Sequence, residues 1–189
     1  MIWYKTGSID EMTGTTGVAH VLEHMMFKGT DKVKAGELSR LVAAVGGREN
    51  AFTSRDYTAY FQQVKKSKLD EVIRLEADRM SSLNFDDAEF LKEIQVVMEE
   101  RRLRTEDNPS SLLNESLMAT AYMSSPYRHP IVGWMNDLQN MTAADAREWY
   151  RNWYKPNNAT VVIAGDVDAL QVLNAIEKYY GAIAVQPLP

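Results

Sequence analysis

The sequence predicts an α+β fold in which a mostly antiparallel sheet packs against several helices. Several segments carry apolar residues at the spacing of amphipathic helices, and others are rich in β-branched and aromatic residues at alternate positions. The two patterns are mixed without the regular β-α alternation that builds a parallel sheet, which favours the α+β class. With 189 residues, 45% of them hydrophobic, the chain is long enough to bury a sizeable core.

The N-terminal half is predicted to contain a strand, three helices and a hairpin. Gly29 follows the first helical pattern, and the Gly46–Gly47 pair follows the second, as expected where helices end. Arg55–Asp56 is the expected turn of the hairpin, because alternating strand-like residues lie on both sides of it. The predicted elements are a strand at 2–5, helices at 17–27, 35–45 and 68–81, and a hairpin at 48–64.

The C-terminal half is predicted to be mainly helical. Pro109 suits the first turn of a helix, and Thr142 with Asp145 resembles a capping box. The predicted elements are helices at 86–104, 109–122, 142–154 and 169–180, a loop at 123–134 and a short buried strand at 159–164. Residues 1–189 are expected to form a single domain, with 182–189 beginning a linker.

Composition excludes several classes of protein and site. The net charge of -5 argues against nucleic acid or an anionic membrane as the main partner. No apolar run approaches the roughly 20 residues that cross a bilayer. The chain has no cysteine, which excludes disulfides, thiolate metal sites and a cysteine nucleophile.

The segment His-Val-Leu-Glu-His at residues 20–24 is the motif that carries chemistry. On a helix, His20 and His24 lie on one face and their imidazoles can reach one point. Two imidazoles suit zinc, and a catalytic zinc site adds a third protein ligand and an open position for water. Glu23 flanks the pair and is placed to take a proton from that water. This is the H-x-x-E-H pattern of inverzincins, the reverse of the H-E-x-x-H motif of zinc peptidases.

The alternative for this motif is a helix with two ordinary histidines and a solvated glutamate. The apolar residues interleaved with the motif predict that the helix is partly buried. Buried imidazoles and a buried carboxylate without partners are costly, which disfavours this alternative.

The helix predicted at 86–104 offers the third ligand. At about 100° per residue, Glu93 and Glu100 share a face with apolar residues, whereas Glu99 points away and is expected to be solvated. Carboxylates on an inward apolar face need a cation or hydrogen-bond donors. Glu100 and Glu93 are therefore the candidates for the metal side. The alternative is that they pair with an arginine, namely Arg48, Arg55 or Arg79.

Longer segments match a known pattern over nearly the whole chain. They are GVAHVLEHMMFKGT at 17–30, GGRENAFTSRDYTAY at 46–60, EADRMSSLNF at 76–85, EFLKEIQVVMEERRLRTEDNP at 89–109, and the later IVGWMNDLQNMT and NNATVVIAGDVD. The chain resembles the N-terminal catalytic domain of the pitrilysin/insulinase/mitochondrial-processing-peptidase family of zinc peptidases, in a bacterial member. The resemblance implies a zinc metalloendopeptidase domain with one Zn²⁺ per chain.

The resemblance also implies a role for each site residue. The family's helix motif supplies two zinc ligands and the general base, which here are His20, His24 and Glu23. A glutamate about 75 residues further on completes the zinc site, and 75 residues separate His24 from Glu100. A further glutamate seven residues before that ligand supports catalysis, and Glu93 stands there.

The hairpin acquires a role only through the resemblance. In the family its first strand is an exposed edge near the zinc, and an extended peptide adds to it as a further strand. Here that strand contains Asn50, Ala51, Phe52 and Thr53. The residues alone favour a purely structural strand. His129 lies in the predicted loop and is expected to pack there or at the surface rather than to bind metal.

The family fold is half of a two-domain unit. A second, similar domain on the same chain or on a partner subunit closes over the peptide, and a further strand precedes the point where this sequence starts. The expected partners are therefore a peptide or small protein substrate and a second homologous domain or subunit. An absent strand would expose a sheet edge and favour a dimer. The fragment is expected to bind metal but to cleave peptides weakly or not at all, in the periplasm or cytoplasm of a bacterium.

Two other classes of function compete with the peptidase. A non-catalytic peptide-binding module or partner subunit of the same fold would show a damaged motif, whereas all four site residues are present here. A structural zinc domain would close its site with a fourth ligand, typically Cys or His. The absence of cysteine and the single spare histidine, His129, disfavour that class.

Overall fold

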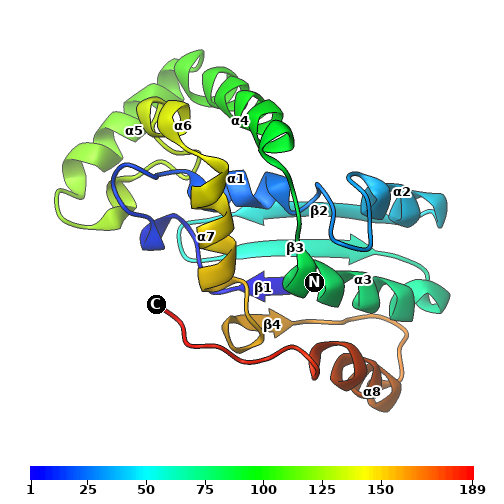
Figure 1. The fold of residues 1–189 in the computed structure, drawn as a ribbon. Coiled ribbons are helices and arrows are strands. Elements are labelled where there is room, and N and C mark those ends of the chain that lie inside the picture. The colour runs from blue at the N-terminus through cyan, green and yellow to red at the C-terminus, as the bar shows by residue number, and fades with distance from the viewer.

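A four-stranded antiparallel sheet organises the fold and confirms the predicted α+β class (Figure 1). The computed structural model describes residues 1–189. The sheet order is β2-β3-β1-β4, so β2 lies at one edge of the sheet. The strands are β1 (Ile2–Tyr4), β2 (Arg48–Thr53), β3 (Thr58–Gln63) and β4 (Ala159–Val161).

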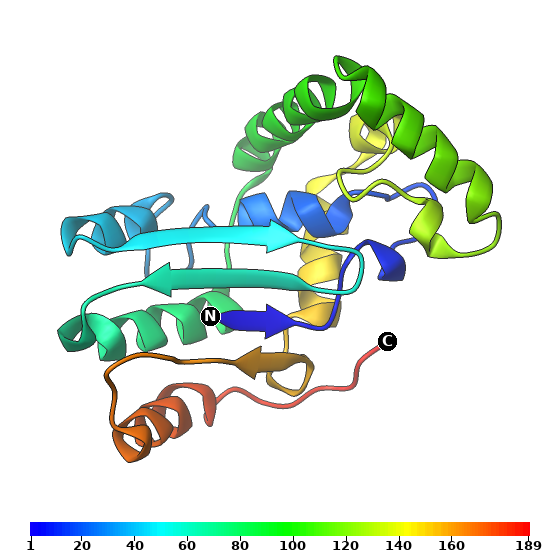
Figure 2. The same ribbon diagram turned by 180° about the vertical axis from the view of Figure 1, so that it is seen from behind.

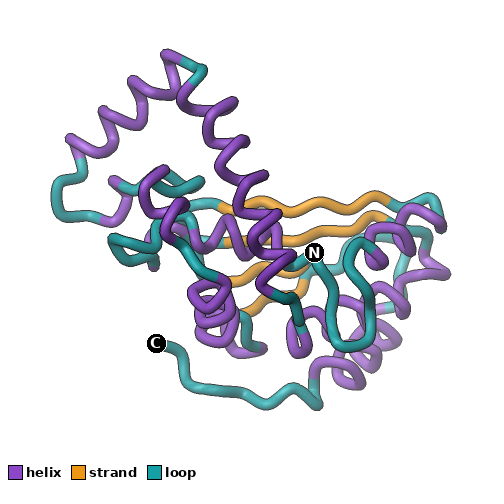
Figure 3. The backbone as a smooth tube through the Cα atoms, turned by 45° about the horizontal axis from the view of Figure 1, so that its top comes forward, coloured by secondary structure: helices purple, strands orange, loops and turns teal.

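Helices cover one face of this sheet. Figure 2 shows the sheet in front, with α1, α3 and α7 behind it. The helices are α1 (Val18–Met25), α2 (Glu37–Ala44), α3 (Leu69–Ser82), α4 (Asp87–Arg101), α5 (Pro109–Ala121), α6 (Met135–Asn140), α7 (Ala143–Trp153) and α8 (Ala169–Tyr180). Figure 3 shows α4 and α5 joined as an arch that extends beyond the sheet. No helix combines the length and apolar character that crossing a membrane requires.

The apolar side of α1 fixes the position of the His20–His24 motif. Val21, Leu22 and Met25 of this helix are 0% exposed, and they belong to a core that joins the sheet to α4 and α7. Burying a side chain of this size contributes roughly 1.5–3 kcal/mol. Because α1 is only eight residues long, this packing rather than helix propensity determines where the histidines point.

The predicted hairpin is present, with β2 and β3 in antiparallel register from Arg48↔Gln63 to Thr53↔Thr58. A backbone hydrogen bond from Ser54 to Tyr57 closes its turn at the predicted place. The outer edge of β2 has no strand beside it, so its backbone groups on that side are free for pairing.

One predicted helix and one predicted strand end earlier than expected, and one helix was not predicted. The helix predicted at 86–104 changes at Arg102 into a π-helical turn, η3 (Arg102–Glu106). The strand predicted at 159–164 ends at Val161, which pairs with Ile2 of β1. The helix α6 was not predicted, because six residues are too short to establish a helical period.

Candidate metal centre

A carboxylate from outside the helix caps the N-terminus of α1. The side chain of Glu11 accepts hydrogen bonds from the backbone N–H groups of Gly17, at 2.8 Å, and Ala19, at 2.9 Å. Glu11 is 4% exposed, and burial raises its carboxyl pKa to about 8. The sequence does not predict this contact, since local capping patterns place the cap next to the first helical residue and Glu11 lies further upstream.

We expect Glu11→Gln to destabilise the fold by about 1–3 kcal/mol. The amide nitrogen of glutamine would face one of the two backbone N–H groups, which leaves a buried donor without an acceptor. For a chain of this length the loss corresponds to a fall in Tm of roughly 2–4 °C per kcal/mol, measured by circular dichroism. Glu177→Gln, on the far helix α8, is the control. An unchanged Tm for Glu11→Gln would contradict this role of Glu11.

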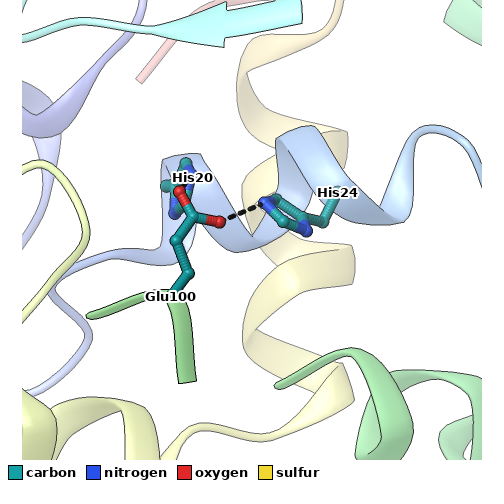
Figure 4. A group of neighbouring side chains, drawn as sticks. All are labelled: His20, His24 and Glu100. Atoms are coloured by element: carbon teal, nitrogen blue, oxygen red, sulfur yellow. Dashed lines mark ion pairs between the residues drawn. The ribbon is translucent and has the colours of Figure 1, made fainter. Parts of the chain in front are cut away.

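Three predicted ligands converge beside α1 (Figure 4). Nε2 of His20 lies 3.6 Å from Oε1 of Glu100, and Nε2 of His24 lies 3.4 Å from Oε2 of the same carboxylate. Ligand atoms of all three residues lie within 4.8 Å of one another. Neighbouring ligands about 2.0–2.1 Å from a tetrahedral zinc lie roughly 3.3 Å apart, so the spacing and donor types suit this metal.

The second predicted glutamate orients one of these histidines. Oε1 of Glu93 lies 2.8 Å from Nδ1 of His24, which leaves Nε2 of that ring facing Glu100. Nζ of Lys28 pairs with the other carboxylate oxygen of Glu93 at 2.5 Å. Hydrogen bonding to His24, followed by Lys28, lowers the pKa of Glu93 despite its partial burial. Lys28 was not predicted, because it lies in the turn that follows the end of α1 at Met25.

The two histidines carry opposite pKa shifts. Burial, with the neighbouring His24, lowers the pKa of His20 to about 4. Burial also opposes charge on His24, but hydrogen bonds to Glu100 and Glu93 outweigh it and raise its pKa to about 9. A metal ligand must give up its proton, so a bound cation would take the place of the proton on His24.

Glu23 lies beside these groups and contacts the edge strand. The hydroxyl of Thr53 donates to its Oε2 at 2.5 Å. Glu23 is 9% exposed, and burial raises its carboxyl pKa, as suits a group that exchanges a proton with water.

One cavity of about 840 Å³ is lined by the candidate base, the three candidate ligands and the predicted substrate strand. The residues that line this cavity include His20, Glu23, His24, Glu100 and all four strand residues, Asn50, Ala51, Phe52 and Thr53.

Glu99 and Glu100 of α4 lie on different faces of the helix, as the helical angles predict. Glu99 is exposed and pairs with Arg102 at 2.9 Å. Glu100 does have an arginine partner, but it is Arg104, one turn later, at 2.6 Å. None of the three arginines proposed from the sequence pairs with Glu93 or Glu100, and Arg79 instead pairs with Glu76.

His129 packs in its loop rather than at the surface. It is 6% exposed, lines the same cavity and does not belong to the ligand group. The predicted loop at 123–134 otherwise contains one short turn of helix, η4 (Pro126–Arg128).

Comparison with known proteins decides the family. A family sequence model described as Insulinase (Peptidase family M16) matches residues 1–133. The chain belongs to this insulinase family. A second model, described as Peptidase M16 inactive domain, matches residues 140–189. The predicted resemblance is therefore confirmed.

The insulinase relatives with the strongest similarity include bacterial proteins named as zinc proteases. "Zinc protease PqqE" of Helicobacter pylori is 41% identical over 182 residues, which is 96% of this chain and 41% of that protein. A zinc protease of Bacillus subtilis is 31% identical, across 96% of this chain and 44% of its own length. This chain thus spans less than half the length of these relatives.

Solved structures of insulinase-family proteins share the fold. A protease from Helicobacter pylori superposes with a TM-score of 0.96 at 40% identity, covering 100% of this chain and 46% of that one. The periplasmic protease PqqL of Escherichia coli gives a TM-score of 0.89 at 26% identity, covering 99% of this chain and 21% of that one.

Proposed function

We propose that this chain carries the zinc centre of a metalloendopeptidase, with His20, His24 and Glu100 as ligands and Glu23 as general base. The observation that carries the proposal is the convergence of three ligand groups beside Glu23, in a cavity lined by an unpaired strand edge. The zinc protease names of the bacterial relatives support the same metal and reaction class.

Each residue has a definite task in the proposed reaction. Zinc bound at this centre would lower the pKa of a water molecule and polarise the scissile carbonyl. Glu23 accepts a proton from water at its carboxylate and later donates it to the leaving amine. The Thr53 hydroxyl keeps that carboxylate oriented toward the cavity.

The substrate is proposed to bind along β2. An extended peptide can pair with the free outer edge of Asn50–Thr53, which places its backbone in the cavity beside Glu23. A second homologous domain or subunit is proposed to close this cavity, since the relatives are more than twice as long as this chain.

The test is peptide cleavage that depends on metal. The zinc-loaded chain is incubated with a mixture of unrelated 10-residue peptides, alone and with the part of the Helicobacter relative that this chain does not match. Mass spectrometry is expected to show new peptide termini, which disappear with a chelator and return with added zinc. Intact peptides in both conditions with zinc present would overturn the proposal.

Glu93→Gln is expected to weaken zinc binding by about 10–100-fold without abolishing it. Its amide cannot pair as strongly with His24 or with Lys28, so the His24 ring loses its fixed orientation. Competition with a fluorescent chelator measures the affinity. Glu89→Gln, one turn earlier on α4, is the control and is expected to bind zinc like the unmodified chain. Equal affinities for the two variants would exclude this role of Glu93.

A further inference from the structure

The cavity has a basic rim that the proposed mechanism does not use. Two arginines that line the cavity, Arg55 and Arg128, form this basic rim. Arg55 lies in the turn after β2, and Arg128 ends η4. The two segments meet here, since the Arg55 guanidinium lies 5.9 Å from the ring centroid of Tyr127 and the Tyr127 hydroxyl donates to Asp56 at 2.7 Å.

Neither arginine of the basic rim has a carboxylate partner, and both are absent from the ion pairs of the structure. Nε of Arg55 is buried without any hydrogen-bond partner. Arg128 donates to the backbone carbonyl of Met123 at 3.3 Å, which leaves its charge uncompensated. Guanidinium groups stay charged at all relevant pH values, so the rim presents two unpaired cations to the cavity.

The carboxylates that line the cavity do not neutralise this rim, because other groups already bind them. They are Glu23 with Thr53, Glu100 with Arg104, and Glu115 with Arg101. Asp56, the residue next to Arg55, accepts from Tyr127 instead. The open space in front of the rim therefore favours an anionic group supplied from outside the chain.

We infer that the basic rim selects substrates with an acidic side chain near the scissile bond. The inference rests on the proposed function, in which a peptide lies along β2. Arg55 lies in the turn that directly follows Thr53, at the end of β2. The acidic residue of the substrate therefore lies beyond the residue opposite Thr53, on the side of the β2–β3 turn. A carboxylate there can accept from a guanidinium fork, which a lysine side chain cannot do.

The test measures binding rather than cleavage, so that its failure differs from failure of the proposed function. The zinc-loaded chain carries Glu23→Gln to prevent turnover. The probes are fluorescent 10-residue peptides with blocked termini, uncharged except for one Glu, one Gln or one Lys moved stepwise along the sequence. Fluorescence anisotropy gives the affinity of each. The double variant Arg55→Glu/Arg128→Glu is compared with a control double variant, Arg74→Glu/Arg151→Glu. The control makes the same change in net charge at exposed residues of α3 and α7.

The expected result is that Glu at one or two adjacent positions binds about 10-fold more tightly than Lys there, with Gln between them. The preference reverses in Arg55→Glu/Arg128→Glu and persists in the control. Equal binding of Glu and Lys peptides, or a preference that survives removal of the rim, would overturn the inference. Acid-selective binding, together with no cleavage by the unmodified zinc-loaded chain combined with the complementary part of the Helicobacter relative, would sustain the rim and reject the peptidase.

Discussion

Glu23→Gln is expected to lower the rate of peptide cleavage by about 10²–10⁴-fold while the chain still binds zinc. Glutamine cannot accept a proton from water or deliver one to the leaving amine. Its amide oxygen can still accept from the Thr53 hydroxyl, so the local fold is expected to persist. The rate is measured on peptides cut by the zinc-loaded chain together with the complementary half of the Helicobacter relative.

Two controls separate loss of the base from loss of the site. Metal content by mass spectrometry is expected to be the same in Glu23→Gln and the unmodified chain. Glu99→Gln, an equivalent change at an exposed position of α4, is expected to leave the rate unchanged. A Glu23→Gln variant that keeps the original rate would show that another group accepts the proton.

The second large effect is expected from Glu100→Gln, which should weaken zinc binding by more than about 100-fold. The substitution removes the only carboxylate of the ligand group. Loss of a residue that only orients a ligand weakens metal binding by about 10–100-fold, and loss of a ligand itself is expected to weaken it more. Calorimetric titration with zinc measures the affinity. The comparison with Glu99→Gln is closely matched, because the two glutamates are adjacent on α4 and differ in whether they face His20 and His24.

Helical geometry accounts for how much of the site the sequence could predict. The four-residue spacing of His20 and His24 and the angular positions of Glu93, Glu99 and Glu100 depend only on regular helix parameters. The structure places these five side chains on the expected faces of α1 and α4. Periodicity alone does not predict which helix packs against α1. The inward carboxylates of α4 and the family resemblance indicate this helix as the source of the third ligand.

Contacts between distant segments explain what the sequence could not predict. Glu11 reaches the start of α1 across a turn-rich segment, and no local pattern marks such a cap. The sequence predicts a regular helix through Arg104, yet Arg104 lies in the π-helical turn η3 and pairs with Glu100. Arg55 and Arg128 meet at the cavity only because η4 folds against the β2–β3 turn. Such features depend on tertiary packing, which a single sequence does not specify.

Anomalous X-ray diffraction at the zinc absorption edge, from crystals of the chain grown with zinc, tests directly whether His20, His24 and Glu100 build a zinc centre. We expect one strong anomalous peak per chain, within about 2.0–2.2 Å of a nitrogen of each histidine and an oxygen of Glu100. No peak, or a peak bound by other residues while this centre stays without metal, would contradict it.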